Sequence, residues 1–142
     1  MTLLPPGPAV RRVAVLRANH LGDLVVALPA LSALRAAHPD AHVTWLGAPL
    51  HAELLAGRPG PWDDVVVVPP CRGVRGSDRD GPELDDPAVQ SFLAAQRARG
   101  YDLALQLHGG GRWSNPFVRA LGARTTAGAA AARLLTLTPA RP

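Results

Sequence analysis

Asp23 is the residue whose type and position best suit chemistry. Residues 12–23 read as a buried strand, a tight turn with one glycine, and the start of a helix. In open α/β sheets, ligands bind where a strand gives way to its helix, so a carboxylate placed there faces a cleft. An ionised carboxylate can take a proton from an attacking hydroxyl. We therefore expect Asp23 to be a catalytic base.

The residues just before Asp23 offer further polar contacts. Arg17, Asn19, His20 and Gly22 lie in the same turn, and we expect them to bind substrate. A structural role is equally open, because Asn19 can cap the helix and Asp23 can complement the helix dipole. The two roles are compatible, since the dipole keeps the carboxylate ionised. His20 and Asp23 alone are too few ligands for a metal ion, so we expect no metal site.

A second glycine-rich turn follows a later strand. Residues 106–116 read QLHGGGRWSNP, and glycines at a strand end let the backbone approach a ligand closely. The dinucleotide pattern fails because Ser114 stands where its last glycine belongs, and the chain has no lysine for a Walker loop, so no cofactor is expected. The alternative is a plain turn. We expect a second wall of the same cleft, built by Gln106, His108, Gly109, Gly110, Arg112 and Asn115.

The elements that must position these two turns alternate between strand and helix. Leu24, Leu28, Leu31 and Leu34 give the first helix an apolar face, and Pro29 predicts a kink or a short first segment in it. Such alternation predicts an α/β fold, a Rossmann-like parallel sheet flanked by helices, with the first strand central. Strands are expected at residues 11–17, 41–47, 64–68 and 101–107, with a short fifth at 125–127, and helices at 22–37, 50–56, 87–99 and 113–121.

Composition divides the chain into three parts. Residues 1–10 are a proline-rich lead-in, residues 11–128 form the Rossmann-like domain, and residues 129–142 are expected to be an irregular, poorly packed tail. The valines after Asp64 predict a strand buried on both faces. The polar segment 71–86 is long for a loop in a compact domain, so it is either mobile or functional.

Charge and cysteine usage argue against several classes of protein. The chain has 142 residues and a net charge of +4, with fifteen arginines that are scattered and not interleaved with aromatics, which argues against nucleic-acid binding. The single cysteine, Cys71, has no recognisable base partner and fits a reducing compartment. No signal peptide or membrane span is recognisable, so a cytoplasmic location is expected. The remaining expectations place His38, His42 and His51 at the surface or an edge, and Trp45 and Trp62 in packing.

Three motifs resemble glycosyltransferase family 9, the ADP-heptose heptosyltransferase family. After the first strand comes R-x-x-x-x-G-D at residues 17–23, then L-P-A-L-x-A-L-R at 28–35 and H-P-D-A at 38–41. Residues 101–109 are similar to the family's Y-D-L-x-x-x-L-x-G segment. Residues 121–128 look like its L-G-A-x-x-R-x-G stretch, with one arginine of the pattern missing. The resemblance covers residues 12–128.

The resemblance implies the N-terminal, acceptor-side half of a GT-B glycosyltransferase that inverts the transferred sugar. Asp23 matches the family's base. The implied partners are a nucleotide-sugar donor and a glycan or glycolipid acceptor of the cell envelope, such as lipopolysaccharide, with a peripheral membrane contact. The donor-binding half is expected to be absent from this chain, so we expect the isolated chain to be inactive. The alternative is a non-catalytic nucleotide- or sugar-binding module with a flavodoxin-like fold.

Overall fold

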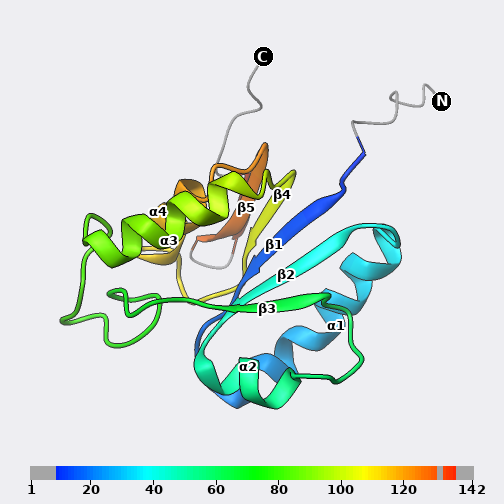
Figure 1. Ribbon diagram of the computed structural model, residues 1–142, viewed down its shortest axis with the longest axis horizontal. Helices are drawn as coiled ribbons and strands as arrows, with labels where there is room; N and C mark the ends of the chain where they lie inside the picture. Colours follow the sequence, from blue (N-terminus) through cyan, green and yellow to red (C-terminus); the bar gives the residue numbers. More distant parts are fainter. Residues whose placement is uncertain (1–8, 131–132, 137–142) are drawn as a thin grey trace.

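The computed structural model describes residues 9–130 and 133–136, and its centre is a six-stranded sheet (Figure 1). The strand order is β3-β2-β1-β4-β5-β6. All neighbours pair in parallel except β5 and β6, which are antiparallel. The central position of β1 is confirmed. The strands are β1 (Arg12–Leu16), β2 (His42–Gly47), β3 (Asp64–Val67), β4 (Leu103–Gln106), β5 (Thr125–Ala130) and β6 (Arg133–Thr136).

Helices cover both faces of this sheet, as Figure 1 shows. Alternate residues of β1 point to opposite faces, which creates two apolar cores. Val13 and Val15 belong to the core beneath α1 and α2, whereas Ala14 and Leu16 belong to the core beneath α3 and α4. The predicted Rossmann-like fold is therefore confirmed. The helices are α1 (Leu21–Ala37), α2 (Pro49–Leu55), α3 (Pro87–Ala98) and α4 (Ser114–Ala120).

The order of the strands places a topological switch point beside β1. The chain runs outward from β1 through β2 to β3, then returns to β4 on the other side of β1. Ligands bind in open α/β sheets at the carboxyl ends of strands where the order reverses in this way. The backbone N–H of Ala18, after β1, donates to Nδ1 of His108, after β4, at 3.2 Å. The two turns singled out in the sequence therefore lie side by side, as predicted.

Helix α1 begins one residue earlier than expected and with a different cap. His20, not Asn19, occupies the N-cap position, in an extended conformation. The side chain of Asp23, in the first turn, accepts a hydrogen bond from the His20 backbone N–H at 3.3 Å. The helix continues through Pro29 to Ala37. Among the described residues, no helix combines the length and apolar character needed to cross a membrane.

Two expectations about burial are wrong. Strand β3 lies at the edge of the sheet, so Val65 and Val66 are half-buried and Val67 is exposed. The valine run predicts a strand but not its place in the strand order. His51 is fully buried, because α2 packs this side chain against the Trp45 ring, with ring centroids 5.6 Å apart. Trp45 itself is in the core, as expected.

The last described residues differ from the expected irregular tail. Strand β5 continues through Ala130, and β6 pairs with it in a register that sets Ala130 opposite Arg133. A sheet edge accepts a further strand through backbone hydrogen bonds, which the side-chain pattern does not reveal. Residues 1–8, 131–132 and 137–142, which include most of the lead-in and the end of the tail, lie outside the described residues.

Candidate functional site

Asp23 is held in an ion pair at the carboxyl end of β1. Its Oδ1 lies 2.8 Å from Nη2 of Arg17, and its side chain remains 31% exposed. The other guanidinium nitrogen, Nη1, donates to the carbonyl of Leu107 after β4. The hydrogen bond from Arg17 is the main cause that lowers the pKa of Asp23, and its charge and the His20 N–H act in the same direction. Asp23 is therefore an ionised carboxylate at neutral pH.

His108 lies against the same turn and is neutral. Its Nδ1 accepts the Ala18 N–H, so Nε2 carries the proton in the neutral ring. Burial, with a smaller effect from the Arg17 charge, lowers the pKa of His108 to about 4. The imidazole is therefore a poor base at neutral pH, and its Nε2–H is a hydrogen-bond donor.

Gln106 and Asn115 lie beneath the turn that carries His108. The Gln106 amide nitrogen donates to Ser114 Oγ at 2.7 Å and to Asn115 Oδ1 at 2.8 Å, and its oxygen accepts the His108 N–H at 2.6 Å. Ser114 Oγ in turn donates to the His108 carbonyl at 2.7 Å. All four side chains are buried. Gln106 and Asn115 thus support the turn from below, whereas the sequence predicted that they would form the cleft wall.

A cleft of about 660 Å³ opens at this edge of the sheet. Three of the predicted residues, Asn19, His20 and His108, line it. The turn between β2 and α2 and the segment after β3 complete the wall, and the sequence had assigned no binding residue to either. These further lining residues are Ala18, Ala48, Pro49, Leu50, Gly73, Gly76, Ser77 and Asp78.

The segment at residues 71–86 is folded onto itself by backbone hydrogen bonds. The Cys71 N–H donates to Arg75, and the Gly73 N–H donates to Ser77 at 2.9 Å. Gly73 has a φ of +65°, and a Cβ there would lie 2.3 Å from the Trp113 ring. Burial raises the pKa of the Cys71 thiol, which fits the expectation that it is not a nucleophile. The length of this polar segment was the signal that marked it as either mobile or functional.

The remaining predicted residues lie outside the cleft lining, and these include Arg17 and Asp23, although Asn19 and His20 between them do line it. Gly109, Gly110 and Arg112 are exposed on the turn after β4, and Arg112 lies over the Trp113 ring at 5.0 Å. Gly22 is exposed in the first turn of α1, and a Cβ there would meet no described atom within 4 Å.

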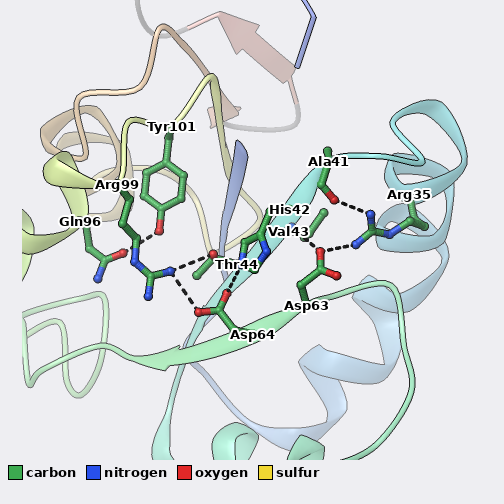
Figure 2. A network of polar contacts seen from close by, with 10 residues as sticks. All are labelled: Arg35, Ala41, His42, Val43, Thr44, Asp63, Asp64, Gln96, Arg99 and Tyr101. Carbon is green, nitrogen blue, oxygen red and sulfur yellow. Dashed lines mark hydrogen bonds and ion pairs between the residues drawn. The ribbon is translucent and has the colours of Figure 1, made fainter. Parts of the chain in front are cut away.

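A second cavity of about 530 Å³ lies at the opposite, amino edge of the sheet, and Figure 2 shows the polar network beside it. Arg99 Nη1 contacts Asp64 Oδ2 at 3.0 Å and Thr44 Oγ1 at 3.1 Å, and His42 reaches the other Asp64 oxygen at 3.1 Å. Arg35 pairs with Asp63 at 2.6 Å. These contacts tie helix ends to strand starts, so we assign this network to stability.

Comparison with known proteins supports the fold. No protein-family model matches the chain, and no curated protein matches it. The glycosyl transferase family 9 structure from Veillonella parvula DSM 2008 aligns with a TM-score of 0.62 and 20% identity, covering 85% of this chain and 32% of that one. The E. coli ADP-heptose LPS heptosyltransferase II aligns with a TM-score of 0.61 and 15% identity, covering 83% and 30%. The chain therefore has the Rossmann-like fold found in these glycosyltransferases, over about a third of their length.

Proposed function

We propose that this chain is the acceptor-side domain of a glycosyltransferase, which moves a sugar from a nucleotide-sugar donor to an acceptor hydroxyl with inversion. The observation that carries the proposal is the Arg17–Asp23 ion pair beside a cleft at the switch point of the sheet. The fold shared with family 9 glycosyltransferases supports it.

Asp23 is the base in this proposal. An acceptor hydroxyl is a weak nucleophile at neutral pH, and it must lose its proton as its oxygen bonds to the anomeric carbon. The bond from that carbon to the donor phosphate breaks on the opposite face, and the phosphate leaves with the electron pair. Asp23 takes the proton. Its lowered pKa keeps it ionised before the reaction and makes it a weak base, so the proton is transferred late in the reaction.

The cleft walls of this chain would bind the acceptor, and a second domain would hold the donor and its phosphates. The acceptor class that we propose is an envelope glycan or glycolipid, by analogy with the lipopolysaccharide in the name of one matched structure. A nucleotide-sugar donor and the single, buried Cys71 fit a cytoplasmic location.

Amide NMR titration of the 142-residue chain tests this assignment. One titration uses the core oligosaccharide of deacylated lipopolysaccharide, and the other uses ADP-heptose. We expect the oligosaccharide to shift the amides of Asn19, His20 and residues 73–78, and ADP-heptose to leave them unchanged. If only the nucleotide sugar bound in the cleft, the chain would be a nucleotide-binding module and the proposal would fail.

A further inference from the structure

His51 is a buried imidazole with one nitrogen in use. The residue is 0% exposed, and its Nδ1 accepts the backbone N–H of Ala48 at 2.9 Å. The neutral ring therefore carries its proton on Nε2. Among the described residues, Nε2 has no hydrogen-bond partner within bonding distance. Burial of an N–H without a partner costs stability, so a group kept in this state calls for an explanation.

The surroundings of His51 connect it to the candidate base. The Trp45 ring lies 5.6 Å away, and its indole N–H donates to the Arg17 carbonyl at 3.0 Å. The pKa of His51 is lowered by burial, which outweighs the opposite effects of the His20 backbone and the Asp23 carboxylate. Through Trp45, His51 is connected to Arg17, whose guanidinium pairs with Asp23 at 2.8 Å. Side chains from β2 and α2 support the turn after β1 from inside the fold.

We propose that His51 is a positioning residue for Asp23. Its ring packs against Trp45, whose indole N–H holds the Arg17 carbonyl, and so fixes how the Arg17–Asp23 pair meets the cleft. Since the same ring binds Ala48, a residue of the cleft wall, His51 also couples that wall to the base. The part about catalysis rests on the proposed function, whereas the positioning itself does not.

Two substitutions separate the two nitrogens of the ring. His51→Asn keeps an acceptor near the position of Nδ1 but has no donor near Nε2. His51→Gln places a donor near Nε2. Titration of the Asp23 side-chain carbon by NMR is the readout, in the intact 142-residue chain. We expect His51→Asn to raise the pKa of Asp23, because its contacts with Arg17 and the His20 N–H loosen, and His51→Gln to leave it close to that of the unsubstituted chain.

His42→Asn is the matched control, since it makes the same chemical change at the opposite edge of the sheet. We expect it to leave the pKa of Asp23 unchanged. The nitrogen shifts of His51 in the unsubstituted chain, expected to report the neutral Nε2–H form, give a measurement that no folding defect can obscure. A proton on Nδ1, or an Asp23 pKa that His51→Asn does not move, would overturn the proposal. Failure of oligosaccharide binding with these results intact would instead refute only the proposed function.

Discussion

Arg17 binds Asp23 and the turn after β4 at the same time. Its Nη2 lies 2.8 Å from Asp23 Oδ1, and its Nη1 donates to the Leu107 carbonyl, 90 residues away in the chain. One guanidinium therefore joins two neighbouring strands to the candidate base. The pair is part of the folded domain before any substrate enters, so the carboxylate is ionised and oriented in advance.

Replacing Arg17 tests this relationship directly. We expect Arg17→Gln to raise the pKa of Asp23, because the substitution removes the hydrogen bond and the charge that lower it. NMR titration of the Asp23 carboxyl carbon measures the change. Arg35→Gln is the matched control, since Arg35 pairs with Asp63 in the same way at the other edge of the sheet. That variant should raise the pKa of Asp63 and leave Asp23 unchanged. An Asp23 pKa that does not respond to Arg17→Gln would contradict the prediction.

Asp23→Asn separates capping from catalysis. Asn keeps the size of the side chain and can still serve at a helix start, so the melting temperature should change little. It cannot accept a proton, so transfer should slow by about two to four orders of magnitude. The assay uses this chain joined to the nucleotide-sugar-binding part of the E. coli heptosyltransferase, since we expect no transfer from the isolated chain. Near-normal transfer, with Asp23→Ala lowering only the melting temperature, would make Asp23 a cap and His20 the next candidate.

The turn after β1 could be predicted because the local sequence pattern and the rule for ligand sites in parallel sheets agree there. A buried strand followed by a glycine and a helix start places Asp23 at a strand end, and parallel strands gather such ends at one edge. The same rule predicted that His108, after β4, would lie beside this turn, as it does. The burial of His51 could not be predicted, because its neighbour Trp45 comes from another element and the packing of α2 on β2 is a tertiary property.

The rest of the cleft wall could not be predicted from the sequence either. Gly73, Ser77 and Asp78 belong to a segment whose path depends on the Trp113 ring and on backbone bonds within the loop. Likewise, Gln106 has the polar character expected of a binding residue, but its position in β4 points it into the buried bonds that hold the His108 turn. Residue type alone could not distinguish a residue that supports the turn from one that contacts a ligand.

Stability should fall as the pH falls from 7 toward 4, because of His108. The pKa of His108 is about 4 in the folded protein, below the ordinary value of 6.5, so the unfolded chain binds more protons between these values. The contribution of His108 to the free energy of unfolding is complete above about pH 6.5 and is lost as the pH approaches 4. A shift of this size corresponds to roughly 3 kcal/mol. His51 acts in the same direction. Urea unfolding at pH 7 and 4.5 measures the loss.

His108→Asn is the control for that measurement. Asn keeps an acceptor near the position of Nδ1 for the Ala18 N–H but does not titrate. The variant should therefore lose less stability than the unsubstituted chain over the same interval. The carboxylates do not confound the comparison, because the shifted aspartates have pKa values below 3.8 and lose their contribution only at lower pH. Equal losses in both proteins would show that His108 is not the titrating group.

Gly22→Ala should move stability and binding in opposite directions. Gly22 lies in the first turn of α1, and a Cβ there would meet no described atom within 4 Å. Alanine is better than glycine in a helix by about 0.5 kcal/mol or more, so the free energy of unfolding should rise. The added methyl group would stand next to Asp23 on the exposed turn, where the proposed acceptor would approach the carboxylate. Its affinity for the core oligosaccharide should therefore fall.

Gly73→Ala distinguishes this loss of access from general damage. Its φ of +65° and the Trp113 ring, 2.3 Å from where the Cβ would lie, make alanine strained there, so stability and affinity should fall together. Urea unfolding and amide titration with the oligosaccharide measure both quantities for each variant. A more stable Gly22→Ala protein with unchanged affinity would mean that the acceptor does not pass this turn. The base would then have to be reached from the side of His20 and Pro49, which both line the cleft.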